Sequence, residues 1–313
     1  MDNKVSRRNF IAGAAVAATA ALAGCSNSSS SSSSSSSTTT TETTTASVKP
    51  VILVTSFGTS YNDSRHITIG AIEDAIREKY GHDYDVRRAF TAQIIIDKLK
   101  SRDGISIDNV TEALDRCVSD GVKEVIIQPT HLMDGLEYND IVTEVNENYN
   151  SKFDKITIGA PLLTDDSDYE AVADAISEAM ADYVSAGYAI CLMGHGTEAD
   201  SNKDYTTMQE TFTKKGMTNF FVGTVEATPT CDDVIASAQA AGFTKAALAP
   251  FMVVAGDHAN NDMADLEDSE SWASKFTAAG FEIECVLKGL GQYDTIDDIY
   301  VQHVADAITA HNA

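Results

Sequence analysis

The stretch Ala189-Ile-Cys-Leu-Met-Gly-His-Gly-Thr197 is the most informative segment of the chain. It starts with an apolar run that is typical of a buried strand, and it ends in a histidine between two glycines. Glycines leave room for backbone and ligand to approach closely, so His195 is a candidate binding or catalytic residue. The ordinary alternative for a lone histidine is a surface or hydrogen-bonded structural side chain.

The sequence after this stretch alternates between helical and strand patterns. A helix that carries Tyr205, Met208 and Phe212 on one stripe follows, and then come a strand at 220–225, a helix at 232–241 and a strand at 245–254. Alternation of this kind predicts a parallel sheet with right-handed helical crossovers.

The first half of the chain repeats the pattern. Strands are expected at 50–56, 84–90 and 124–128, with a helix at 108–118 whose N-cap would be Asp108. Phe57-Gly-Thr59 matches His195-Gly-Thr197, and the spacing of Pro129, Gly135 and Glu137 equals that of Pro250, Gly256 and His258. These repeats predict an α/β fold of two similar lobes, residues 50–185 and 186–313, with parallel sheets around a central cleft, and a last helix at 295–310 packed on one lobe.

Three ligand-type side chains follow consecutive predicted strands of the second half. They are His195, Glu226 and His258. If the strands are parallel neighbours, their ends bring two imidazoles and a carboxylate to one cleft, which is a ligand set for a borderline divalent metal. Glu226 taken alone is weak, since it could equally be a proton acceptor or a helix-capping charge, and the whole constellation could be a coincidence.

The first half offers residues for the opposite wall of such a cleft. His131 and Glu137 follow the strand at 124–128, Phe57 follows the first strand, and Arg88 lies on the second. We expect these four side chains to contact the bound small molecule, with Arg88 receiving a carboxylate of an anionic substrate. The alternative for Arg88 is an ion pair with a local acidic residue.

The N-terminal 49 residues contain patterns typical of export signals and are not expected to contribute to the hydrophobic core. Arg7 and Arg8 precede a short apolar stretch, as in a twin-arginine signal, and Leu22-Ala23-Gly24-Cys25 resembles a lipobox. Residues 1–25 are therefore predicted to be a signal peptide, and Cys25 to carry a lipid on the outer face of the cell membrane. The alternatives are a short anchor or a chance Arg-Arg pair. Residues 26–49, mostly Ser and Thr, are predicted to be a disordered tether.

The folded part is strongly acidic. Residues 50–313 hold 18 basic and 45 acidic side chains, a net charge of −27. Such a surface repels phosphate backbones, so nucleic-acid binding is not expected and cations or neutral ligands are favoured. The ordinary reason for an acidic surface is solubility.

The chain from residue 50 onward resembles the anaerobic-pathway sirohydrochlorin cobaltochelatases, a class II-type chelatase family with a ferrochelatase-like fold. The matching stretches are Ile52-Leu-Val-Thr-Ser-Phe-Gly-Thr-Ser60, Ile127-Gln-Pro-Thr-His131, Gly135-Leu-Glu-Tyr138, Met193-Gly-His-Gly-Thr197, Gly223-Thr-Val-Glu226 and Ala255-Gly-Asp-His-Ala-Asn-Asn-Asp262. The resemblance implies a metal chelatase that inserts Co²⁺ into sirohydrochlorin during cobalamin biosynthesis. It also implies that His195 and His258 are the metal-binding and catalytic pair and that Glu226 is their acidic partner.

The export signal departs from this pattern, because cobalamin synthesis is cytoplasmic. The leading hypothesis is an exported, lipid-anchored chelatase. The rival is a surface lipoprotein that binds cobalt, haem or another tetrapyrrole without turnover. Fe²⁺, Ni²⁺ and Zn²⁺ all accept the same ligand set, and the sequence leaves open a bound haem and a homo-oligomer.

Overall fold

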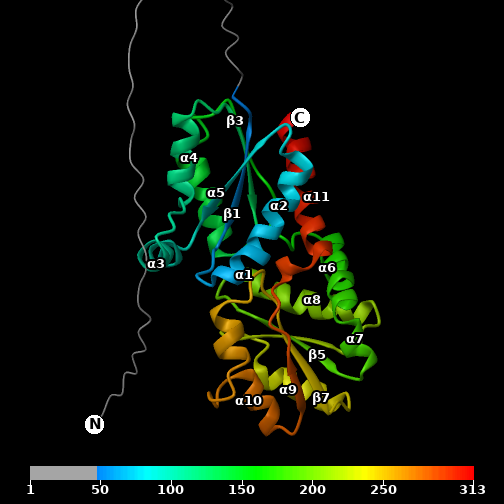
Figure 1. Cartoon of the computed structure of the whole chain (residues 1–313). Coiled ribbons are helices and arrows are strands. Elements are labelled where there is room, and N and C mark those ends of the chain that lie inside the picture. The colour runs from blue at the N-terminus through cyan, green and yellow to red at the C-terminus, as the bar shows by residue number, and fades with distance from the viewer. Residues whose placement is uncertain (1–47) are drawn as a thin grey trace, which may run out of the picture. The chain divides into compact units, whose positions relative to one another are not determined.

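Two four-stranded parallel sheets form the framework of the molecule (Figure 1). The computed structural model describes residues 48–313. The first sheet has the order β2-β1-β3-β4 and the second the order β6-β5-β7-β8, so the two sheets share one topology. This confirms the predicted α/β fold with two similar lobes. The strands are β1 (Val51–Ser56), β2 (Asp85–Phe90), β3 (Glu124–Pro129), β4 (Lys155–Ile158), β5 (Ala189–Gly194), β6 (Phe220–Thr224), β7 (Lys245–Pro250) and β8 (Glu282–Cys285).

Helices connect successive strands. They are α1 (Asn62–Ile67), α2 (Ile69–Tyr80), α3 (Gln93–Asp103), α4 (Val110–Ser119), α5 (Leu136–Asn148), α6 (Asp166–Ala179), α7 (Ala181–Ser185), α8 (Lys203–Lys214), α9 (Cys231–Ala240), α10 (Trp272–Ala278) and α11 (Asp294–Asn312). Short 3₁₀ turns at Asp200–Asn202 and Leu290–Gln292 and a π-helical turn at Ala259–Met263 complete the elements. Within residues 48–313, none of the helices has the length and apolarity needed to cross a membrane.

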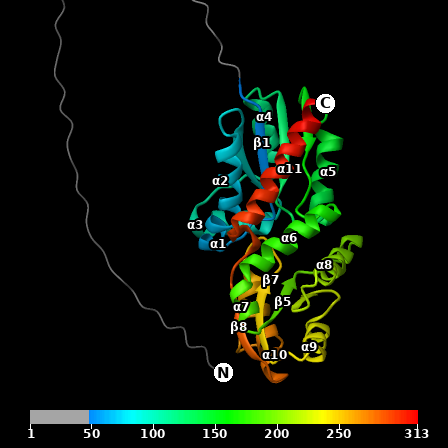
Figure 2. The same cartoon turned by 90° about the vertical axis from the view of Figure 1, so that its right-hand side faces the viewer.

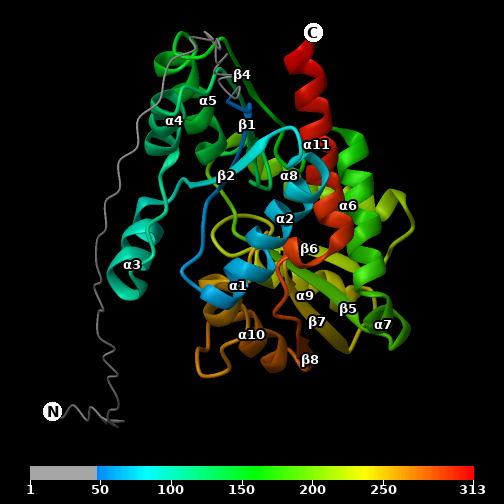
Figure 3. The ribbon, with the colours of Figure 1, turned by 45° about the horizontal axis from the view of Figure 1, so that its top comes forward.

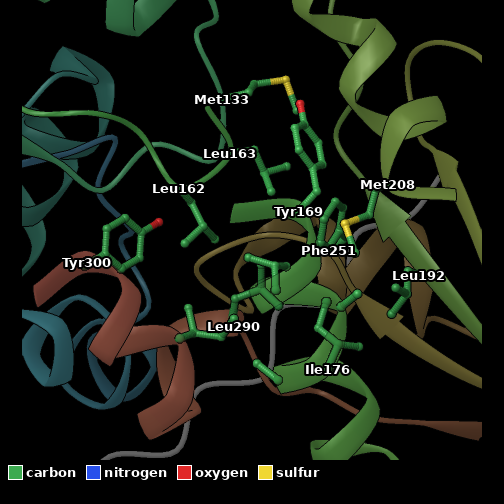
Figure 4. Packing of buried hydrophobic residues seen from close by; sticks show 14 of the residues in the cluster. Met133, Leu162, Leu163, Tyr169, Ile176, Leu192, Met208, Phe251, Leu290 and Tyr300 are labelled. Atoms are coloured by element: carbon green, nitrogen blue, oxygen red, sulfur yellow. The ribbon is translucent and has the colours of Figure 1, made fainter. Parts of the chain in front are cut away.

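Alternating side chains of the strands divide the core into layers. In β5, Ile190 and Leu192 face a cluster that also contains Ile52 and Val54 of β1. The intervening residues of each strand face separate clusters on the outer sides of the two sheets. The two lobes therefore share one central apolar layer, which Figure 4 shows around Leu192, Phe251 and Tyr300.

Helix α11 comes last in the sequence but packs on the first sheet. It contacts β3, β4 and α2, and it lies beside α6 in Figures 2 and 3. The Tyr300 hydroxyl donates to the carbonyl of Thr130, and His303 pairs with Asp168 of α6 at 3.0 Å. The strands of the first sheet precede residue 185 and those of the second follow it, whereas α11 returns across that boundary.

The ends of two elements differ from the predictions. The N-cap of α4 is Asn109, which forms a capping box with Glu112, whereas Asp108 pairs with Arg116. Strand β7 ends at Pro250 and does not continue to residue 254, because its pairing with β5 stops at Met193 and Pro250. Residues 252–254 instead line a cavity.

The predicted signal peptide, the lipobox Cys25 and the tether up to residue 47 lie outside the described residues.

Candidate active site

A cavity of about 510 Å³ lies where the carboxyl ends of the central strands of both sheets meet. Its walls come from the loops that follow β1, β3, β5 and β7. Ligands of open parallel sheets bind at this end of the strands, and the volume is in the usual range for small-molecule pockets. The predicted central cleft is therefore present, and both lobes contribute to it.

His195 and His258 line this cavity together. Their ring centroids are 4.6 Å apart and the rings are nearly perpendicular, at 87°. His195 follows β5 directly, whereas His258 lies eight residues past the end of β7 in a long loop. The two imidazoles thus come together as predicted, although His258 is not at a strand end.

Each histidine of this pair has an acceptor at Nδ1. His195 Nδ1 lies 2.7 Å from the carbonyl oxygen of Gly196, and His258 Nδ1 lies 2.8 Å from Oδ2 of Asp262. Because a carbonyl and a carboxylate accept and do not donate, Nδ1 carries the proton in the neutral form of each ring. Both Nε2 atoms therefore have a free lone pair that can take a metal ion or a proton.

Glu226 lies beside His195. Its Oε2 is 3.8 Å from His195 Nε2, and its backbone N–H donates to the carbonyl of His195. Among residues 48–313, no three His, Cys, Asp or Glu side chains are already grouped closely enough to hold a metal ion. The histidine pair and the neighbouring carboxylate are thus within reach of one another, and the three-ligand set stays a prediction.

His131, Glu137 and Phe57 line the cavity from the first lobe. The Nδ1 atom of His131 is buried and has no hydrogen-bond partner among the described residues, and burial lowers its pKa to about 4. His131 is therefore a neutral imidazole at physiological pH. Its Nε2 lies 3.5 Å from the hydroxyl oxygen of Thr91.

Arg88 does not line the cavity. Its guanidinium forms two 2.6 Å hydrogen bonds to the carboxylate of Glu73, whose side chain is buried. A bidentate pair of this kind occupies the donors that a substrate carboxylate would need. The structure therefore corresponds to the ion-pair alternative for Arg88 and not to the predicted substrate contact.

Equivalent glycines shape the two halves of the cavity. Gly58 and Gly196 have φ angles of +99° and +90°, and a Cβ atom would lie 2.6 Å from the ring of Phe90 or 2.8 Å from the backbone of Ala227. Only glycine both adopts a positive φ angle without strain and leaves room for these close contacts. The matching Gly-Thr dipeptides of the sequence thus mark matching tight turns.

Three polar residues of the site were not predicted. Asp262 accepts from His258, and the Tyr61 hydroxyl donates to Asp257 at 3.2 Å, which joins the two walls of the cavity. The four-residue spacing of His258 and Asp262 is visible in the sequence and suits a helical turn, but the strand assigned up to residue 254 left that turn unrecognised.

Comparison with solved structures defines the class of fold. SirB from Bacillus subtilis with Fe³⁺ aligns with a TM-score of 0.59 at 15% identity, over 85% of this chain and 98% of that structure. CbiX, described as the terminal enzyme for siroheme biosynthesis in denitrifying bacteria, aligns with a TM-score of 0.50 at 16% identity, over 82% and 99%. The fold is that of the two-lobed chelatases.

The sequence narrows this class to one family. The model of the cobalt chelatase family CbiK matches residues 50–309. The sirohydrochlorin cobaltochelatase of Salmonella typhimurium is 37% identical over 83% of this chain and 97% of its own length. The sirohydrochlorin cobaltochelatase CbiKC of Nitratidesulfovibrio vulgaris is 30% identical over 84% and 92%. The chain belongs to the CbiK cobalt chelatase family.

Proposed function

We propose that this chain inserts Co²⁺ into a sirohydrochlorin-type tetrapyrrole. The observation that carries the proposal is the pair of imidazoles that line the cavity, with ring centroids 4.6 Å apart and with both Nδ1 atoms in hydrogen bonds to acceptors of the protein. Two neighbouring Nε2 lone pairs suit a reaction in which a dication and two protons change places. Membership of the CbiK family supports the same reaction.

The reaction is a proton-for-metal exchange. Two pyrrole N–H bonds break, two protons leave, and four ring nitrogens bind Co²⁺. The site must hold the ion weakly enough to release it and must accept protons beside the ring. We propose that His195 and His258 perform both tasks and that Glu226 assists at His195. The net charge of −27 over residues 50–313 favours arrival of the dication.

The other wall of the cavity is suited to the macrocycle. We propose that Phe57 and the neutral ring of His131 contact the flat face of the tetrapyrrole, and that Glu137 lies near its edge. A neutral His131 does not repel an incoming dication, since its pKa of about 4 keeps it uncharged. The apolar contact area then supplies most of the binding free energy.

Absorbance spectroscopy tests the proposal. The purified chain, mixed with sirohydrochlorin and Co²⁺, should change the tetrapyrrole spectrum far faster than the same mixture without protein. Fe²⁺, Ni²⁺, Zn²⁺ and haem are tested in parallel, since their binding stays a prediction of the sequence. A rate equal to the spontaneous one would contradict the proposal.

A carrier role is the second candidate, and the lipobox with its Ser/Thr tether favours it. A carrier binds cobalt or tetrapyrrole tightly but does not accelerate metalation. Binding without acceleration in the same assay would therefore support the carrier in place of the enzyme.

We further propose that the chain is exported and anchored through a lipid on Cys25, because a twin-arginine pattern and a lipobox occur in the right order. Mass spectrometry of the membrane fraction should find a diacylated N-terminal Cys25. A Cys25→Ser variant should lose the lipid, and an unmodified Cys25 in wild-type protein would contradict the anchor.

A further inference from the structure

The loop after β7 holds His258 at the start of an unusual turn. Residues Ala259–Met263 are π-helical, and His258 immediately precedes them with helical dihedral angles. The side chain of Asn260 donates to the carbonyl of Gly256 at 2.6 Å, which ties the turn to the preceding loop. Single π-helical turns are rare and are often found at functional sites. Here the turn brings the carboxylate of Asp262 next to the ring of His258.

The two histidines of the cavity are held by different kinds of acceptor. His195 bonds to the carbonyl of the next residue in its own loop, whereas His258 bonds to a side chain four residues away. A backbone acceptor cannot be removed by substitution, but Asp262 can. The orientation and tautomer of His258 therefore depend on one identifiable residue.

We infer that Asp262 is a positioning residue for metalation: it holds His258 as the Nδ1–H tautomer and so directs the Nε2 lone pair into the cavity. This inference rests on the proposed function, since it assigns a role within the same site. Without Asp262, the His258 ring is free to rotate and to place its proton on Nε2, where the proton blocks the lone pair.

A purely structural role for the pair is a weaker explanation. The two side chains are 34% and 42% exposed, and exposed pairs at this spacing contribute little to stability. A histidine that binds metal or accepts a proton, in contrast, commonly uses a carboxylate on its other nitrogen to fix its orientation.

Nitrogen-15 NMR of the full chain without metal tests the tautomer directly. His258 is assigned by comparison with His258→Gln, and the spectra are recorded at a pH at which the ring is neutral. Wild-type protein should show His258 as the Nδ1–H form, and Asp262→Ala should gain a substantial Nε2–H population. A wild-type ring in the Nε2–H form, or identical tautomers in both proteins, would overturn the inference.

Kinetics give the second readout. Asp262→Ala should lower kcat/KM for Co²⁺ roughly 10- to 100-fold, as removal of such carboxylates does at other histidine metal sites. Glu267→Ala is the matched control, because Glu267 is an exposed carboxylate in the same loop and its removal changes the net charge equally. The control should keep wild-type kinetics and the Nδ1–H tautomer.

The two experiments separate the inference from the proposed function. Wild-type protein without chelatase activity would refute the proposed function, while the NMR result would still decide the tautomer. Full activity in Asp262→Ala, beside an active wild type, would refute the positioning role alone. Circular dichroism of the variant establishes that it remains folded, and Asp262→Asn, which retains an acceptor oxygen, should recover part of the lost activity.

Discussion

The substitution Asp297→Asn should stabilise the protein at alkaline pH. Asp297 lies in the first turn of α11 and is only 5% exposed, and its Oδ1 atom has no hydrogen-bond partner among the described residues. Burial, together with the nearby charges of Asp294 and Asp298, raises its pKa from 3.8 to about 8. The folded protein therefore keeps this carboxyl protonated, whereas the unfolded chain releases the proton near pH 4.

The sign of the pH dependence follows from this difference. Between about pH 4 and pH 8 the folded state binds one more proton than the unfolded state, so the free energy of unfolding falls as the pH rises. At about 1.4 kcal/mol per pH unit, the cost reaches at most roughly 6 kcal/mol above pH 8. An asparagine removes this cost but buries an amide, which costs about 1–3 kcal/mol if its hydrogen bonds are incomplete. We expect a net gain of roughly 2–4 kcal/mol at pH 8.5 and none at pH 4.

Urea unfolding followed by circular dichroism at pH 4 and pH 8.5 measures the free energy of unfolding under both conditions. Asp306→Asn is the matched control, because Asp306 is an exposed carboxylate of the same helix and its charge is not among those that raise the pKa of Asp297. The control should change stability little at either pH. If Asp297→Asn changes the free energy of unfolding equally at both pH values, or makes the protein less stable than wild type at pH 8.5, the carboxyl is charged in the folded protein and the reasoning is refuted.

Two further predictions concern the cavity and the end of β5 that leads to it. His195→Ala and His258→Ala should each lower the metalation rate roughly 10²–10⁴-fold in the absorbance assay while the urea midpoint stays close to wild type; normal turnover in either variant would remove that histidine from the mechanism. Gly194→Ala should destabilise the fold by about 1–3 kcal/mol in urea unfolding, because the new Cβ would lie 2.1 Å from the ring of Tyr205. Gly135→Ala, where the nearest atom is 3.7 Å away, is its control, and equal effects of the two would refute the steric argument.

The sequence predicted the fold where local patterns were strong. The apolar runs of β1, β3, β5 and β7 are buried on both faces, as expected for central strands of parallel sheets, and the repeated Gly-Thr turns indicated the duplication. The edge strands β4 and β8 are four residues long and half exposed, so their pattern is weak. They were the elements least visible in the sequence.

The site was predictable to the extent that side chains follow the strands. His195 directly follows β5 and Glu226 lies two residues past β6, so the order of the strands in the sheet was enough to predict their proximity. The partner of His258 depends on a π-helical turn, and the pairing of Arg88 with Glu73 depends on how α2 packs against β2. Such contacts are set by tertiary packing, which local sequence patterns do not encode.

The return of α11 to the first sheet has a consequence for biosynthesis. Helix α11, which covers β3 and β4, is synthesised after both sheets, so the first lobe stays incomplete until the second has been made. The first lobe therefore cannot close as an independent unit while the second is being made. Synthesis of α11, and not of either sheet, sets the moment at which the cavity between the lobes can form.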